Sequence, residues 1–336
     1  MLEAFWWGSV FLINVPIVLI ALTATFFIAP PNIANPTKHW DFISSIYALF
    51  ALSGLILGIK EMANTSRSAE VIVIAAVSFS VGAFCFARRQ QKLDDPLLTF
   101  DIFRSRIFSG GVIGAAGSMF AMAGLEMTTT QKLQLADGFS PLEAGLAVAA
   151  VALSALPMSA IGGANLHRVG FLPLIVGGFT AIAGGTGIVI WATTVDYFPL
   201  LLAGMIFLGL GAGSVMSVAS IAIIGAAPVH RTGMAASVEE VSYEFGALVS
   251  IAVVGSALPS VYSSLLPTEL QEAGMGALYD ERTQAVAADA FSSAYVTTAS
   301  ALAIISLIFI AVTAWCFRDN PRSGNAHAAH PVAASH

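Results

Sequence analysis

The sequence predicts an all-α integral membrane protein with about nine transmembrane helices, and two observations carry this prediction. Hydrophobic residues make up 57% of the 336 residues and charged residues only 10%, whereas a soluble domain carries about 25% charged residues. Apolar runs of roughly 20 residues, enough for a helix to cross a hydrocarbon core of about 30 Å, recur along the chain. These features exclude a soluble enzyme, a nucleic-acid-binding protein with a basic face and a disordered chain.

Charged residues, Pro/Gly clusters and polar stretches separate nine apolar segments, and we expect each segment to form one helix through the lipid bilayer. In chain order they are residues 5–29, 42–57, 71–86, 110–130, 144–164, 171–193, 200–227, 235–258 and 293–317. The two cysteines, Cys85 and Cys316, are too few for a disulfide framework.

The basic residues predict the orientation of these spans, because Lys and Arg are enriched in cytoplasmic loops. One set of alternate loops carries 10 of the 14 basic residues and the other set carries 4. The richer set should be cytoplasmic, which places the C-terminus inside and the N-terminus outside. An outside start without a preceding basic residue is unusual, so we expect further spans upstream of Met1.

The connections outside the membrane carry most of the remaining charge. Residues 259–292 should form an acidic periplasmic loop. This loop either contains a short amphipathic piece over residues 266–278 or is solvated along its whole length. Residues 319–336, rich in Ala, Ser, Pro and His, predict a disordered cytoplasmic tail. The tail histidines lack the partners of a metal site.

Three acidic residues lie well inside the eighth predicted span, where a charge costs several kcal/mol. Counted from Arg231 along a helix, Glu240 is about 13 Å and Glu244 about 20 Å into the membrane. Their i,i+4 spacing places both on one face, with Glu239 about 100° away and Tyr243 close enough to donate a hydrogen bond to Glu239 or Glu240. Desolvation and repulsion favour the protonated carboxyl groups. The four residues are therefore a candidate proton-coupling and cation-binding site, the alternative being carboxyl groups held permanently neutral.

Other residues are candidates for lining a substrate cavity. Glu126 lies about 30 Å along the fourth span, where it faces either a cavity or the outer interface. Met122 and Met158 could contribute to an adaptable apolar wall for flat cations, or simply face lipid. Asn14 and Pro16 interrupt the first span and predict a kink, as in the broken helices that line transport paths.

Glycines cluster within two of the spans. We expect them to permit close approach of neighbouring helices and not to bind phosphate. They are Gly177, Gly178, Gly184, Gly185 and Gly187 in one span and Gly204, Gly209, Gly211 and Gly213 in the next.

Catalytic and metal-binding motifs are absent from the sequence, so we expect no enzymatic activity, cofactor, metal site or nucleic-acid partner. A membrane-embedded enzyme, the alternative, would have only Glu126 and the glutamate cluster as candidate acids.

Three segments carry a resemblance to a known family. Phe5–Pro16 (FWWGSVFLINVP) resembles the start of the sixth helix of the 14-spanner drug:proton antiporters of the major facilitator superfamily. Ser140–Gly145 (SPLEAG) resembles the loop before their tenth helix. Gly233–Gly246 (GMAASVEEVSYEFG) resembles the thirteenth helix of members that export quaternary ammonium compounds and methyl viologen.

This resemblance implies that the nine spans correspond to helices 6–14 of a 14-helix fold whose N-terminal bundle is largely missing. Residues 1–30 would then be the last helix of that bundle, residues 31–107 two linker helices with a cytoplasmic loop, and residues 108–318 the C-terminal six-helix bundle. The loop motif between the family's second and third helices and its Gly-Pro antiporter motif have no counterpart here. Proton coupling would therefore rest on the glutamates of the eighth span.

The expected function is export of lipophilic cations and drugs against proton entry across the bacterial inner membrane, as part of a longer multidrug antiporter that confers antibiotic resistance. Two alternatives remain open at this point: a truncated, transport-inactive membrane fragment, and an exporter of another substrate such as a siderophore or lipid.

Overall fold

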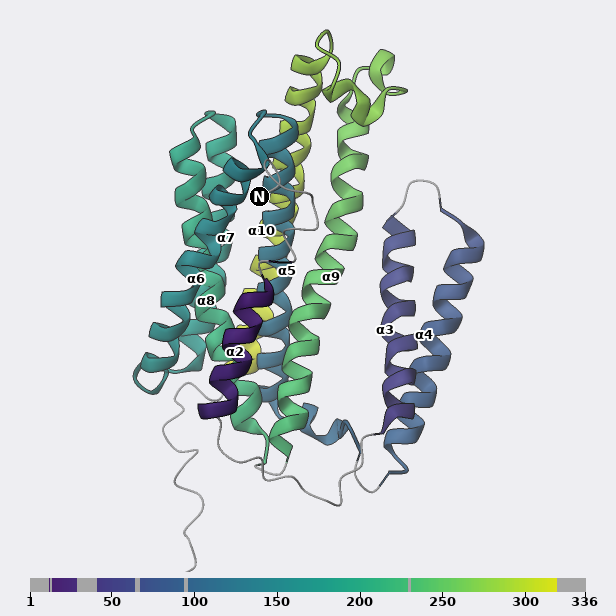
Figure 1. The fold of residues 1–336 in the computed structure, drawn as a ribbon, viewed down its shortest axis with the longest axis vertical. Coiled ribbons are helices and arrows are strands. Elements are labelled where there is room, and N and C mark those ends of the chain that lie inside the picture. Colours follow the sequence, from purple (N-terminus) through teal and green to yellow (C-terminus); the bar gives the residue numbers. More distant parts are fainter. Residues whose placement is uncertain are drawn as a thin grey trace, which may run out of the picture.

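The computed structural model describes residues 12, 14–28, 41–63, 67–93, 96–228 and 231–318. Within these ranges the chain forms α-helices and short 3-10 helices and no strand (Figure 1), which confirms the all-α class. The helices are α2 (Asn14–Ile28), α3 (Phe42–Ala63), α4 (Ala69–Gln90), α5 (Arg106–Leu135), α6 (Pro141–Val169), α7 (Phe171–Thr194), α8 (Phe198–Ala226), α9 (Thr232–Leu265) and α10 (Gln284–Phe317), with 3-10 segments η1 (Phe100–Arg104), η3 (Thr268–Leu270) and η4 (Gly274–Leu278).

Each predicted span overlaps one of these helices. Eight of them, α3 to α10, are long and apolar enough to cross a membrane, while the described part of α2 is shorter at 15 residues. Most helices run past the predicted ends, and side-chain caps begin α4, α5 and α6. At α6, for example, the Ser140 hydroxyl accepts from the Glu143 amide at 3.3 Å while the Glu143 carboxylate accepts from the Ser140 amide at 2.9 Å.

The predicted outer loop over 259–292 is too long, because α9 continues to Leu265 and α10 begins at Gln284. Packing between the two ends accounts for the extension: the buried rings of Tyr262 and Phe291 meet edge to face, 5.5 Å between centroids. Of the amphipathic piece predicted over 266–278, the structure forms only η3 and η4, and η4 buries Ala277 and Leu278.

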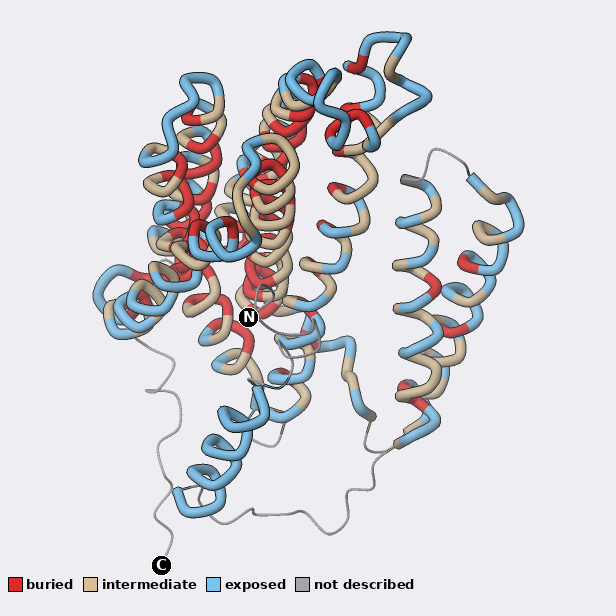
Figure 2. The backbone as a smooth tube through the Cα atoms, turned by 45° about the horizontal axis from the view of Figure 1, so that its top comes forward, coloured by how far each residue is buried: buried red, intermediate tan, exposed pale blue. Residues whose placement is uncertain are grey.

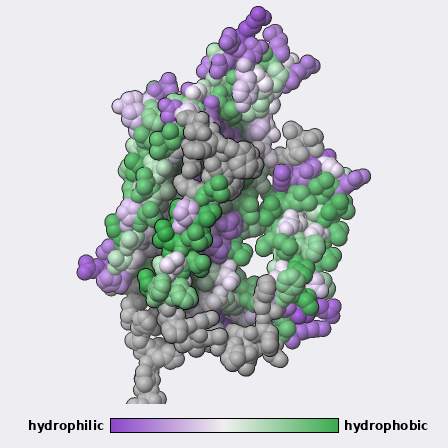
Figure 3. Space-filling model, in the orientation of Figure 1, coloured by the Kyte–Doolittle hydropathy of each residue, from purple (hydrophilic) through white to green (hydrophobic). Residues whose placement is uncertain are grey.

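Helices α5 to α10 pack around a common core in which α5 and α8 are the central elements. In the most apolar stretch of α5 and of α8, more than half of the residues are buried. The corresponding share is about a sixth in α6 and about a quarter in α9 and α10. Figure 2 shows the buried residues concentrated inside this bundle. Figure 3 shows a hydrophobic surface over the middle of the helices with hydrophilic residues towards both ends, as expected for lipid contact.

Glycines set the distance between α8 and its neighbours, as predicted for six of the nine positions. A Cβ on Gly185 would meet the carbonyl of Gly204 at 2.7 Å, and one on Gly204 would meet the carbonyl of Gly185 at 2.8 Å. Gly178 and Gly211 pair in the same way between α7 and α8, while Gly209 and Gly213 lie against the α6 backbone. The prediction is wrong for Gly177, Gly184 and Gly187, which have open space around them.

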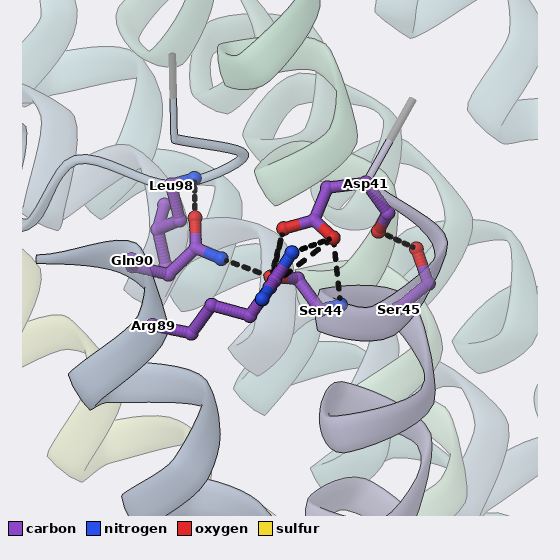
Figure 4. Close-up of polar contacts among 6 residues, drawn as sticks. All are labelled: Asp41, Ser44, Ser45, Arg89, Gln90 and Leu98. Atoms are coloured by element: carbon purple, nitrogen blue, oxygen red, sulfur yellow. Dashed lines mark hydrogen bonds and ion pairs between the residues drawn. The ribbon is translucent and has the colours of Figure 1, made fainter. Parts of the chain in front are cut away.

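The α3–α4 pair stands beside α9, apart from the rest of the bundle (Figure 1). At one end of the pair, Arg89 makes a two-pronged ion pair with Asp41, with Nε–Oδ2 and Nη2–Oδ1 distances of 2.9 Å (Figure 4). Hydrogen bonds from Arg89 and then Ser44 hold the pKa of the Asp41 carboxyl well below its usual range. The buried Gln90 donates to Ser44 and accepts from the Leu98 amide, which joins the pair to the segment leading into α5.

Among the described residues, helices α2 to α10 alternate in direction, so the two loop sets fall at opposite ends of the molecule (Figure 1). The basic residues at one end are Arg88, Arg89, Lys92, Arg104, Arg106, Arg168, Arg231 and Arg318, and those at the other end are Lys60, Arg67, Lys132 and Arg282. Lys38 and Arg322, which complete the argument for orientation, lie outside the described residues, as does the predicted disordered tail over 319–336.

Candidate proton-coupling and cation site

The glutamate cluster lies in the first half of α9, a helix of 34 residues. Measured from Thr232 at 1.5 Å per residue, Glu240 is about 12 Å and Glu244 about 18 Å along the helix axis. The helix itself spans about 51 Å by the same measure, more than a hydrocarbon core requires. These positions are therefore at intramembrane depth when α9 crosses a bilayer.

One face of α9 packs into the bundle and the glutamate pair lies on the opposite face. Buried Ser242, Gly246 and Ser250 point inward, and Gly246 lies directly against the carbonyl of Ala116 on α5. Glu240 and Glu244 are exposed, whereas Glu239, turned towards the bundle, is half-buried. The pair thus faces away from the six-helix bundle, where a ligand or another polypeptide segment can reach it.

Tyr243 joins the cluster to α8. Its hydroxyl donates a hydrogen bond to the main-chain carbonyl of Met216, with an Oη–O distance of 3.0 Å, and its ring packs on a small apolar cluster that includes Ala219 and Ile223. The hydroxyl is thus engaged with α8, and the expected hydrogen bond from Tyr243 to Glu239 or Glu240 stays a prediction.

Glu126 is half-buried on α5, nine residues before that helix ends at Leu135. Met122, one turn earlier on α5, is also half-buried. The threonines that follow are hydrogen-bonded within the bundle: Thr128 donates to the Gly124 carbonyl at 2.9 Å, and Thr129 is bonded to the Tyr295 hydroxyl of α10 at 2.7 Å. Both threonines are buried in the bundle.

The remaining cavity-lining candidates are not brought to the glutamates. Met158 is half-buried on α6, beside Pro157. Asn14 and Pro16 are exposed in the first turn of α2, and none of the described residues of α2 is buried. The kink predicted there cannot be followed upstream, because residues 1–11 and 13 lie outside the described part of the chain.

A cavity at the other end of the bundle was not predicted. It has a volume of about 400 Å³ and lies where α5 and α7 end and α8 begins. The buried Lys132 ammonium contacts the Asp137 carboxylate there, with an Nζ–Oδ2 distance of 2.6 Å. The i,i+5 spacing of these two residues across a helix end was the only sequence signal for the pair.

Within the described ranges, no group of three or more His, Cys, Asp or Glu side chains is placed to hold a metal ion.

The fold and the cluster together define a multi-pass, all-helical membrane protein with three glutamates in the first half of one membrane-length helix. No protein-family model matches the chain. Several bacterial proteins are similar to the chain. It is 29% identical to a methyl viologen resistance protein, SmvA, of Salmonella typhimurium, over 79% of this chain and 53% of that protein. It is 29% identical to the multidrug efflux pump LfrA of Mycolicibacterium smegmatis, over 95% and 67%, and 22% identical to the multidrug resistance protein Stp of Mycobacterium tuberculosis, over 80% and 50%.

These relatives confirm the resemblance predicted from the sequence: the chain is related to bacterial multidrug efflux and methyl viologen resistance proteins. It spans about half the length of the SmvA protein it matches. Among solved structures, a bacterial homologue of the human lysosomal transporter Spinster, in an inward-facing and unoccupied conformation, is similar with a TM-score of 0.48 and 13% identity. That similarity covers 81% of this chain and 67% of the other.

Proposed function

We propose that this chain takes part in proton-coupled export of lipophilic, quaternary-ammonium-like cations across the bacterial inner membrane, as part of a longer transporter. The observation that carries the proposal is the pair Glu240 and Glu244, exposed on one face of a membrane-length helix at intramembrane depth. A carboxyl group in such a position is costly, and it is typical of sites that bind protons or cations. The names of the relatives, which include methyl viologen resistance and multidrug efflux, favour the same substrate class.

In this proposal the two exposed carboxyl groups exchange protons for cations. A protonated glutamate is neutral and tolerates a low-dielectric surrounding, whereas an ionised glutamate balances the charge of a bound organic cation. Competition between proton and cation for the same carboxylates is the minimal requirement for exchange. Glu239 and Tyr243 support the pair from the bundle side, and Glu126, Met122 and Met158 are further candidates for the cavity wall.

The arrangement of the chain within the longer transporter belongs to the same proposal. Helices α5 to α10 would be the C-terminal bundle, α3 and α4 the linker pair and α2 the last helix of the preceding bundle. The exposed faces of α6 and α9 would then meet the other half of the transporter. The 10 to 4 distribution of basic residues supports a cytoplasmic C-terminus.

The decisive experiment measures competition between cation and proton directly. The 336-residue chain, purified in lipid nanodiscs, is titrated with tetraphenylphosphonium in weakly buffered solution near neutral pH, and proton release is recorded together with cation binding. We expect the wild type to release protons as the cation binds, and the double variant Glu240→Gln/Glu244→Gln to lose both signals. Removal of two exposed acids from the outer loop, Glu269→Gln/Glu272→Gln, is the charge-matched control and should change neither.

Cation binding that persists in the double variant without proton release would contradict the proposal. The transport step is tested in a full-length version, in which the same double variant should lose ethidium efflux driven by a pH gradient. Efflux that survives the substitutions would place coupling elsewhere, and proton–cation competition without any efflux would indicate a transport-inactive product.

A further inference from the structure

The cavity of about 400 Å³ lies at the end of the bundle away from the glutamate cluster. Its walls come from the end of α5, the end of α7 and the first turn of α8. The rings of Phe139 and Phe198, 5.2 Å apart between centroids, form part of its apolar lining. Its polar side chains belong to Lys132, Asp137, Thr193, Asp196 and Tyr197.

The ammonium group of Lys132 has hydrogen-bonding capacity left over on one wall. The Lys132 side chain is buried, and Nζ donates to the two carboxylate oxygens of Asp137 at 2.9 and 2.6 Å. An ammonium group has three hydrogens, and the described residues supply no third acceptor for Lys132. Because a buried donor without an acceptor is unfavourable, an occupant that presents an oxygen atom to Lys132 is favoured.

The turn after α5 holds the Lys132–Asp137 pair in place. The Asp137 amide donates to the Lys132 carbonyl at 3.1 Å, and the Phe139 amide donates to the Leu133 carbonyl at 2.8 Å. Gly138 lies between them with φ of 72°, which a glycine adopts without steric cost. The carboxylate is thereby folded back onto the ammonium group. The pair is formally neutral, so it offers a donor to the cavity without net charge.

The opposite wall favours a cation. Asp196 is exposed at the turn between α7 and α8, where the Tyr197 amide donates to the Ala192 carbonyl at 3.0 Å. Among the described residues, no basic side chain forms an ion pair with Asp196. Of the helices that line the cavity, α5 and α7 end there and only α8 begins there, so the helix dipoles add to the negative charge of this wall.

The cavity also lies at the depth of the lipid headgroups. Trp191, in the last turn of α7, and Tyr197, just before α8, are both exposed. Exposed Trp and Tyr at the ends of membrane-length helices are typical of the interface between hydrocarbon and water. The groups available to fill a cavity at this depth are therefore lipid headgroups as well as soluble molecules.

We propose that this cavity binds the phosphoethanolamine headgroup of a membrane lipid. A phosphate oxygen accepts the remaining hydrogen bond from Lys132, and the ammonium group of the headgroup donates to the Asp196 carboxylate. The headgroup joins the end of α5 to the turn between α7 and α8. The site is separate from the proposed proton–cation exchange, because none of its residues belongs to the glutamate cluster.

Native mass spectrometry of the full chain, delipidated in detergent, tests the site by counting bound lipids. The probes are palmitoyl-oleoyl phosphatidylethanolamine and palmitoyl-oleoyl phosphatidylglycerol, which share a phosphate group but differ in the ammonium group. We expect the wild type to bind the first phosphatidylethanolamine more tightly than the first phosphatidylglycerol. Lys132→Met should weaken that phosphatidylethanolamine about tenfold, as for the loss of a hydrogen bond to a charged group.

The variant Asp196→Asn tests the ammonium end of the headgroup. Asp196 has φ of 49°, a conformation that asparagine also adopts, and the side chain is exposed, so the fold should be unaffected. We expect phosphatidylethanolamine to bind about twofold to fivefold more weakly, the range for an exposed ion pair. The preference over phosphatidylglycerol should disappear. Glu272→Gln, which removes an exposed acid from the outer loop, is the control and should change neither lipid.

Three outcomes would overturn the lipid site. Equal binding of phosphatidylethanolamine by the wild type, Lys132→Met and Asp196→Asn would leave the cavity to water. Binding of soluble glycerophosphoethanolamine without binding of the lipid would assign the site to a free zwitterion. Binding of tetraphenylphosphonium that is lost in Asp196→Asn, without a preference for phosphatidylethanolamine, would make the cavity a site for organic cations.

Discussion

Gly246 on α9 lies directly against the main-chain carbonyl of Ala116 on α5, two residues beyond Glu244. The two helices are in backbone contact at this point because glycine has no Cβ. Even the smallest side chain there would overlap the Ala116 backbone, which a rotamer change cannot relieve. The position of the glutamates relative to the bundle therefore depends on Gly246, a residue without a side chain that could bind a proton or a cation.

Gly246→Ala is expected to destabilise the protein by about 1–3 kcal/mol, the usual range for overpacking. The matched control is Gly177→Ala on α7, where a Cβ would meet open space. Because alanine favours a helix over glycine by roughly 0.5–1 kcal/mol, the control should be neutral or stabilising. Unfolding in mixed detergent micelles, followed by circular dichroism, measures both. Equal effects of the two substitutions would show that α5 and α9 are not in backbone contact.

The ion pair between Asp41 and Arg89 should stabilise the α3–α4 pair over most of the pH range. The pKa of Asp41 is lowered in the folded protein, so its contribution is fully present above the unfolded value of about 3.9 and is lost as the pH falls through the lower folded value. Asp41→Asn should therefore lower the unfolding midpoint at pH 7, and the wild type should approach the variant only in strong acid. A difference that already disappears near pH 6 would contradict the assignment.

A double-mutant cycle gives the partner of Asp41. If Arg89 is that partner, Arg89→Gln should cost little once Asp41→Asn is present, because the two substitutions remove one shared interaction. Additive losses would assign the stabilisation to Ser44 and the helix start instead.

The pair formed by Lys132 and Asp137 should respond unequally to removal of its two members. The Lys132 side chain is 5% exposed and that of Asp137 is 24% exposed. Asp137→Asn leaves a buried ammonium group without its counter-charge, whereas Lys132→Met leaves a carboxylate that water can reach. We expect a loss of about 2–4 kcal/mol for Asp137→Asn and a clearly smaller one for Lys132→Met. The reverse order in chemical unfolding would mean that the ammonium group reaches solvent.

Carbodiimide labelling should distinguish the three glutamates of α9. Dicyclohexylcarbodiimide partitions into lipid and reacts with protonated carboxyl groups, so the exposed Glu240 and Glu244 should be modified faster than the half-buried Glu239. Mass spectrometry of proteolytic peptides gives the rates. Tetraphenylphosphonium should slow modification of Glu240 and Glu244; labelling unaffected by the cation would separate the reactive carboxyl groups from cation binding.

The sequence by itself determined where the helices lie and which acids are in them. Transfer of a segment into a bilayer depends on its own composition, so the apolar runs predict each helix without knowledge of its neighbours. The spacing of Glu240 and Glu244 places them on one face for the same local reason. The ends of α9 and α10 could not be located in this way, since Tyr262 and Phe291 extend the two helices by packing on each other.

The tertiary structure alone decided which groups meet across helices. Gly178 and Gly177 are adjacent and chemically identical, yet only Gly178 touches α8. Tyr243 has a glutamate within one turn, yet its hydroxyl donates to Met216, 27 residues earlier in the chain. Pairings of this kind depend on the rotation of one helix against another. That rotation is set by the summed packing of the whole bundle and not by any local pattern.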